Sequence, residues 1–141
     1  MAEPTSCCLA AGTYCTRCDL LVGLPGLRVT AVARDDGGGL TVQVESPPEP
    51  MGCHTCGVLA HRHGRLEVRL VDAPAFGAPV RIVWVKRRWR CPEDSCPVGS
   101  FTEQDERVAA PRAKLTTRAR SWAIRQLRRE HASVNGIRRQ L

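Results

Sequence analysis

The stretches CHTCG at residues 53–57 and CPEDSC at residues 91–96 decide the fold of this chain, because they hold two closely spaced pairs of cysteines. The first pair has two residues between its cysteines, and the second pair has four. Zinc binds four thiolates in a tetrahedron, and spacers of this length allow both sulfurs of a pair to reach one ion. Gly57, directly after the first pair, suits the tight turn of a zinc knuckle. The sequence therefore predicts a closed, structural Zn2+ site formed by Cys53, Cys56, Cys91 and Cys96.

The 34 residues between the two pairs predict a β-hairpin that returns the chain to the metal. Residues 66–71 and 80–90 have the pattern of strands, and the second strand is long, basic and leads directly into Cys91. The prolines and the glycine of residues 72–79 frame the turn. A redox-active Cys-x-x-Cys pair would be expected beside a β-α-β pattern, which this sequence lacks. The segment therefore favours structural zinc over redox chemistry.

Three histidines compete with the cysteines as ligands. His54 lies between Cys53 and Cys56, so its side chain must point away from the metal if both cysteines bind. His61 and His63 belong to a polar stretch that we interpret as a turn, where we expect them to be solvated or to face phosphate.

Four further cysteines near the N-terminus raise the question of a second metal site. Cys15 and Cys18 have a suitable spacing for one ion, whereas the adjacent Cys7 and Cys8 do not. We expect thiols without metal at all four positions, and a second zinc site is the alternative.

The segments on either side of the metal-binding region complete the organisation. Residues 27–32 and 40–45 alternate apolar and polar side chains around a glycine-rich turn, which predicts a β-hairpin. The proline-rich residues 46–50 are a stiff boundary. Near the C-terminus, Thr116 is the expected N-cap of a basic amphipathic helix that ends near residue 131, and Ser133 is the expected N-cap of a second helix.

The fold class that follows is a small α+β protein. It has an N-terminal β-hairpin, a zinc-ribbon-like β module and C-terminal helices. The expected division is a cysteine-containing leader (1–20), a β-hairpin segment (21–50), a zinc-binding β module (51–100), a linker (101–112) and a truncated helical DNA-binding segment (113–141).

Charge is distributed unevenly along the chain, whose net charge is +7. Residues 1–52 carry three basic and six acidic side chains, and residues 53–141 carry eighteen basic and eight acidic ones, a net charge of +10. A concentration of positive charge in one part of a chain favours a polyanionic partner, here DNA. The side chains expected to contact DNA are Lys86, Arg87, Arg88, Arg90, Arg118, Arg125, Arg128 and Arg129. Of Trp84 and Trp89, we expect one in the core and one against a partner or an arginine.

The N-terminal sequence, MAEPTS, has neither the basic nor the apolar region of a signal peptide. No apolar run approaches the roughly 20 residues that cross a membrane. We therefore expect the protein in a reducing bacterial cytoplasm, where cysteines serve more often as metal ligands than in disulfides.

The sequence resembles insertion-sequence transposases of the ISL-three family, which carry an N-terminal cysteine-rich zinc-binding domain. The likeness covers about residues 20–141, and its most specific part is the zinc motif with the basic strand. The matching segments are residues 52–57, 68–74, 79–84, 86–91, 96–97, 101–104, 115–119 and 133–134.

This resemblance implies a DNA-binding region that recognises the inverted repeats at the ends of an insertion sequence. It also implies that the C-terminal helices are the start of a helix-turn-helix. The family also implies a catalytic domain with three acidic residues, for which this chain offers no counterpart before it ends at Leu141. We therefore expect no enzymatic activity from the chain and assign no catalytic residue. Double-stranded DNA is the expected partner, and a second copy of the chain or a full-length transposase could join it. The alternatives are a zinc-ribbon adaptor that binds protein in transcription and an inactive, truncated transposase remnant.

Overall fold

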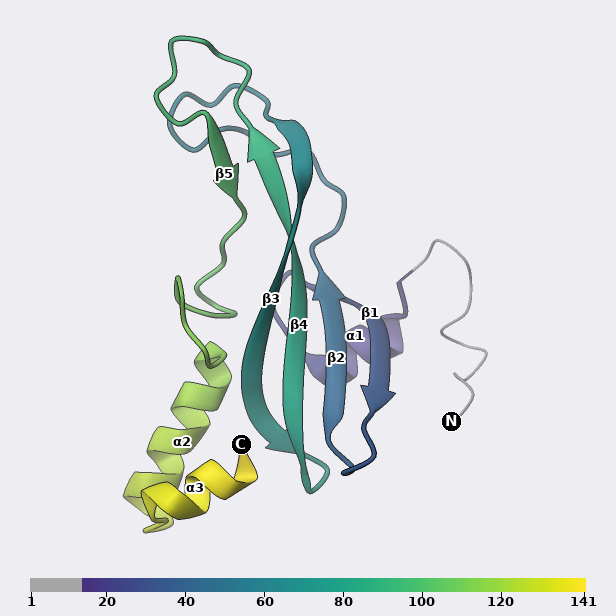
Figure 1. Cartoon of the computed structure of the whole chain (residues 1–141), viewed down its shortest axis with the longest axis vertical. Coiled ribbons are helices and arrows are strands. Elements are labelled where there is room, and N and C mark those ends of the chain that lie inside the picture. The colour runs from purple at the N-terminus through teal and green to yellow at the C-terminus, as the bar shows by residue number, and fades with distance from the viewer. Residues whose placement is uncertain (1–13) are drawn as a thin grey trace.

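The computed structural model describes residues 14–141, so Cys7 and Cys8 lie outside the described residues. The fold is a small α+β structure in which one mixed sheet is flanked by helices (Figure 1). Its elements are α1 (Thr16–Val22), β1 (Arg28–Arg34), β2 (Leu40–Glu45), β3 (His61–Ala75), β4 (Ala78–Arg90), β5 (Ser100–Thr102), α2 (Thr117–Arg129) and α3 (Val134–Gln140).

The sheet has the strand order β1-β2-β4-β3, with β5 paired to β4 beyond the end of β2. β1 and β2 form the expected antiparallel hairpin, and β3 and β4 form a longer antiparallel ribbon. β2 runs parallel to the first half of β4, from Leu40 opposite Val80 to Val44 opposite Trp84. The N-terminal hairpin and the metal-binding segment, which the proline-rich residues 46–50 separate in the sequence, therefore share a single sheet.

The hydrophobic core lies on one face of this sheet. Val80, Ile82 and Trp84 alternate along β4, and Val44 of β2 and Leu70 of β3 lie opposite them in register. Paired residues of neighbouring strands project from the same face, so these side chains form one apolar layer. The segments that complete the core contribute Leu24, Leu27, Val108 and Ala109.

The β3–β4 ribbon is longer than its sequence pattern suggests. Residues 72–75, expected in the turn, continue β3, and only Phe76 and Gly77 form the turn, both with positive φ. Residues 61–65, expected as a turn, also belong to β3, and a β-bulge between Arg62 and Arg65 interrupts their pairing with β4. A bulge accommodates Gly64, whose φ is 92°, without ending the strand.

Two segments carry structure that the sequence pattern did not reveal. α1 spans only seven residues and buries none of them, so it has no apolar periodicity to detect. The expected linker of residues 101–112 contributes to the core, since Val108 is fully buried and Ala109 is 3% exposed. Two isolated apolar residues in a polar stretch do not form a recognisable pattern until the sheet covers them.

The C-terminal helices begin where the sequence predicts. The Thr116 hydroxyl accepts a hydrogen bond from the Ala119 amide at the start of α2, and the Ser133 hydroxyl accepts one from the Gly136 amide at the start of α3. α2 buries Ala119 and α3 buries Ile137. Within residues 14–141, no helix has both the length and the apolar composition needed to cross a membrane.

Candidate metal centre

The first cysteine pair lies in a tight loop that precedes β3. The amide of Cys53 donates to the carbonyl of Val58, and the amide of Gly57 donates to the carbonyl of Cys53, both at 2.8 Å. Gly57 has a φ of 76°, a conformation that glycine adopts without steric cost. This loop is the knuckle expected from the first pair, and it presents Cys53 and Cys56 on one side.

The second pair lies where the ribbon ends. Cys91 follows the last residue of β4, and its amide donates to the carbonyl of Gly99 at 2.7 Å. The amide of Cys96 donates to the carbonyl of Glu93 at 3.0 Å, which closes a second turn. β5 then pairs with residues 88–90 of β4, so the ribbon holds this loop on both sides.

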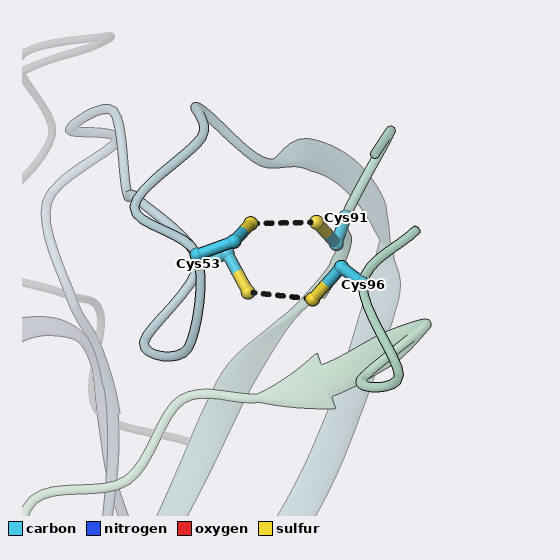
Figure 2. A group of neighbouring side chains, drawn as sticks. Cys53, Cys91 and Cys96 are labelled. Atoms are coloured by element: carbon cyan, nitrogen blue, oxygen red, sulfur yellow. Dashed lines mark hydrogen bonds between the residues drawn. The ribbon is translucent and has the colours of Figure 1, made fainter. Parts of the chain in front are cut away.

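The four sulfurs converge between the two loops (Figure 2). The Sγ atoms of Cys53 and Cys96 are 3.8 Å apart, those of Cys56 and Cys91 are 3.5 Å apart, and all four lie within 4.8 Å of one another. A tetrahedral ion with Zn–S bonds of about 2.3 Å requires sulfurs roughly 3.8 Å apart. The cysteines therefore fit Zn2+, and four thiolates leave no coordination position open for water or substrate.

Electrostatics also favour a cation between the sulfurs. Backbone hydrogen bonds from Cys56 and Thr55 lower the pKa of Cys53 to about 6. A backbone hydrogen bond from Glu93 lowers the pKa of Cys91, but burial and the neighbouring sulfurs outweigh it and raise the pKa to about 12. Cysteine binds a metal as the thiolate, and four thiolates this close repel one another. A bound divalent cation offsets this repulsion, so the cluster favours a metal ion.

The rival ligands lie outside this centre. The ring of His54 packs edge-on against Phe101, with centroids 5.2 Å apart, so it points away from the sulfurs as expected. His61 and His63 are exposed on β3. Cys15 precedes α1 and Cys18 lies within it, and both are half-buried. Among residues 14–141, Cys53, Cys56, Cys91 and Cys96 are the only group placed to share a metal ion.

Three of the basic residues expected to contact DNA are instead engaged within the protein. Lys86 is 9% exposed, its Nζ lies 4.2 Å from the Trp84 ring centroid, and it donates to the side chain of Gln104. Burial lowers the pKa of Lys86, against the charge of Glu103, which raises it. Trp84 and Trp89 are both buried. The Trp84 ring packs in the core and also contacts the Lys86 ammonium group, and Trp89 lies in the interior and not on the surface.

Arg87 and Arg118 are held by specific partners. The guanidinium of Arg87, whose side chain is 8% exposed, donates to the Ser46 carbonyl at 2.9 Å. Arg118 donates through Nε to the Asp72 carboxylate at 2.9 Å and also to the carbonyl of Val22 at the end of α1. Both guanidinium groups therefore donate to partners within the protein, while the Arg118 side chain is still 41% exposed, and the expected contacts of both residues with DNA stay a prediction.

The remaining candidates are exposed. They are Arg88, Arg90, Arg125, Arg128 and Arg129. The structure brings Arg88 and Arg90 to the metal end of the ribbon, whereas the other three lie on α2 near the opposite end of the molecule (Figure 1). The sequence-predicted basic residues therefore form two separate surfaces.

Sequence reasoning missed the buried network at the start of α2. Asp72 is 1% exposed, and its carboxylate accepts hydrogen bonds from the Thr116 hydroxyl at 2.6 Å and from Arg118. These partners lie more than forty positions apart, so no local pattern links them. Arg62 and Arg65 were not among the basic residues expected to contact DNA, because residues 61–65 were interpreted as a turn. A glycine inside a strand can mark a β-bulge, and Gly64 is the signal that could have placed both arginines on a strand.

Comparison with known proteins agrees with the metal centre. Residues 49–96 match the family model of the zinc-finger of transposase IS204/IS1001/IS1096/IS1165, and this segment contains all four cysteines. The comparisons with curated proteins and with solved structures gave no match.

Proposed function

We propose that this chain, which contains a transposase zinc finger at residues 49–96, acts as the DNA-binding N-terminal region of a transposase. In this role it recognises the inverted repeats at the ends of an insertion sequence. The observation that carries the proposal is the zinc-finger match, together with the net charge of +10 on residues 53–141. Positive charge concentrated around such a module is the electrostatic footprint of a nucleic-acid partner.

The metal has a structural part in this proposal. A closed four-cysteine site cannot activate water or bind substrate, because it lacks an open coordination position. Zinc instead joins the knuckle before β3 to the loop after β4 and so fixes the end of the ribbon. The exposed Arg88 and Arg90 lie immediately before Cys91, so the metal holds the strand that carries them.

DNA contacts are assigned to the two exposed basic surfaces. Arg88 and Arg90 form the one on the ribbon, and Arg125, Arg128 and Arg129 form the one on α2. Lys86, Arg87 and Arg118 are given positioning roles, because each is bound within the protein. The two surfaces lie toward opposite ends of the long axis, so a duplex would touch both only by extending along the molecule (Figure 1).

Salt dependence of duplex binding tests the proposal. Each phosphate neutralised by an arginine releases a counterion, so log affinity falls with log salt with a slope of about 0.9 per contact. With roughly four to six contacts, affinity is expected to fall by a factor of about a hundred or more between roughly 50 and 200 mM salt. Fluorescence anisotropy with an element-end duplex and a scrambled duplex measures both the slope and the preference for the element end.

The matched variants for this experiment are Arg125→Gln with Arg128→Gln, and Arg34→Gln as the control. The pair removes exposed charges from α2, and Arg34 is an exposed arginine on β1 that donates to the Gly38 carbonyl. The pair should weaken binding to both duplexes and flatten the salt slope, whereas the control should change neither. No binding of either duplex at low salt would contradict the proposal.

A protein-binding adaptor is the second candidate function. Its support is a group of exposed apolar side chains on the C-terminal helices, where Ile124 is 39% exposed, Leu127 43% and Val134 72%. Such side chains favour a protein partner over a phosphate backbone. Affinity for DNA that does not change with salt would favour this candidate.

A further inference from the structure

A small cleft in the β3–β4 ribbon is lined almost entirely by arginines. It has a volume of about 200 Å³, and the residues around it are Arg62, Gly64, Arg65, Arg87 and Arg88. Two of the arginines come from β3 and two from β4. The cleft lies at the metal end of the ribbon, where Arg90 and Cys91 follow. No acidic side chain lines it, so it is a concentrated site of positive potential.

The β-bulge creates this cleft. Arg62 pairs with Trp89 and Arg65 pairs with Arg87, so residues 63 and 64 together lie opposite Arg88. The extra residue increases the local twist and redirects the neighbouring side chains. Gly64 has a φ of 92°, and a Cβ atom placed on it would have no atom within 4 Å. The backbone at the bulge is therefore open to an approaching ligand.

Glu45 of β2 holds two of the arginines in place. Its carboxylate accepts hydrogen bonds from Arg65 and from the Tyr14 hydroxyl, the latter at 2.7 Å, and lies 3.9 Å from the Arg87 guanidinium. Burial raises the pKa of Glu45, but the hydrogen bonds from Arg65 and Tyr14 and the charges of both arginines outweigh it, so the pKa is lowered. Glu45 thus remains ionised and orients Arg65 and Arg87 before any ligand arrives.

One carboxylate does not neutralise the cleft. The Arg87 side chain is buried and donates to the Ser46 carbonyl, and the three exposed arginines of the lining, Arg62, Arg65 and Arg88, exceed the charge of Glu45 by two. Each guanidinium has five N–H donors, so Arg65 keeps donors free after binding Glu45. Within residues 14–141, no hydrogen bond or ion pair engages the side chains of Arg62 and Arg88. The site therefore offers several charge-assisted donors in an arrangement that Glu45 preorganises.

We propose that this cleft binds a phosphate group of the DNA backbone, which places the bulge of the ribbon against the duplex. The inference rests on the proposed function and adds Arg62, Arg65 and Gly64 to the residues that perform it. Guanidinium groups match the oxygens of a phosphate in pairs, and orientation by Glu45 lowers the entropy lost when they bind. Such a contact sets the position of the protein on DNA and carries no sequence information.

Two single variants, with a control from the same strand, test the site. Arg62→Gln and Arg88→Gln each remove one cleft charge, whereas Arg69→Gln removes a charge from β3 outside the cleft. Arg69 is 78% exposed and pairs with Glu67. If one phosphate contact is lost, the salt slope should fall by about 0.9, and affinity at about 0.1 M salt should fall about eightfold. Arg69→Gln should match the wild type.

The readouts separate this inference from the broader proposal. All variants are first checked for an unchanged far-ultraviolet spectrum and zinc content. If the wild type binds DNA and the two cleft variants behave like Arg69→Gln, the phosphate site is wrong and DNA binding stands. If the wild type binds no DNA at low salt, both proposals are overturned. Tighter binding to polyglutamate than to DNA of equal charge would identify an acidic protein as the ligand and overturn the phosphate assignment.

Discussion

Removal of zinc is expected to unfold the metal end of the ribbon while the rest of the sheet remains folded. Within residues 51–60 and 91–100, the only buried side chains are Cys53, Ala60 and Cys91. The two loops therefore have no apolar core of their own. In small modules of this kind, structural zinc contributes about 10 kcal/mol or more of folding free energy at neutral pH. The sheet between β1 and β3 retains its own core around Val44, Ile82 and Trp84.

Hydrogen exchange with and without a chelator measures this effect. The amides of Cys53, Gly57 and Cys91, which donate within the two loops, should lose protection when the metal is removed. The amides between β2 and β4 should retain it, because their hydrogen bonds lie beside the core.

Substitution of a ligand should reproduce the effect of the chelator. Cys91→Ser is expected to purify without stoichiometric zinc, whereas Ser95→Ala, in the same loop, should retain one zinc per chain. Ser95 is exposed, and among residues 14–141 its one hydrogen-bond partner is Glu93, which makes it a suitable control. A wild-type protein that folds cooperatively and protects these loops without metal would show that zinc has no structural role.

Asp72→Ala is expected to cause a large loss of stability outside the metal centre. The change removes the buried carboxylate that accepts hydrogen bonds from Thr116 and Arg118. Thr116 is fully buried, so its hydroxyl is left without this acceptor, and Arg118 loses its counter-charge. Breaking a buried pair costs about 3–5 kcal/mol, and the 41% exposure of the Arg118 side chain reduces this to about 2–3 kcal/mol.

The matched control for Asp72→Ala is Glu67→Ala. Glu67 lies on the same strand and also pairs with an arginine, Arg69, but its side chain is 49% exposed. Exposed pairs contribute little, so the control should lose less than about 1 kcal/mol. Urea unfolding monitored by circular dichroism gives both values from the shift in midpoint. Equal stability of the two variants would show that the Asp72 network does not anchor α2 to the sheet.

The residues around the metal centre show which features of the structure short-range sequence patterns can predict. The spacing within each cysteine pair and Gly57 after the first pair predict the knuckles, because a short spacer alone determines whether two sulfurs can face one ion. The caps at Thr116 and Ser133 are local for the same reason, since each hydroxyl bonds an amide three residues ahead. The four-cysteine cluster that fits Zn2+ and the starts of both C-terminal helices were therefore predicted correctly.

Pairing between distant segments could not be predicted in this way. β2 and β4 run parallel, and the chain between them forms the cysteine knuckle and β3, so no local turn signal marks them as neighbours. The burial of Val108 and Ala109 in a stretch expected to be a linker depends on that sheet being assembled. α1 was not predicted because it is only seven residues long and buries none of them, so its sequence shows no periodic apolar pattern.

The sequence by itself determined where the positive charge is concentrated and which cysteines form the metal centre, because composition and short-range spacing are enough for both. Tertiary structure alone decided which cations remain available to a partner. Lys86 donates a hydrogen bond to Gln104 and Arg87 donates one to Ser46, and these acceptors lie 18 and 41 positions away along the chain. Arg62 and Arg65 lie at one cleft because a β-bulge separates them on β3, and Glu45 on a third strand holds Arg65 there. A guanidinium binds whichever acceptor the fold places beside it, and that neighbour is fixed only when the strands pair.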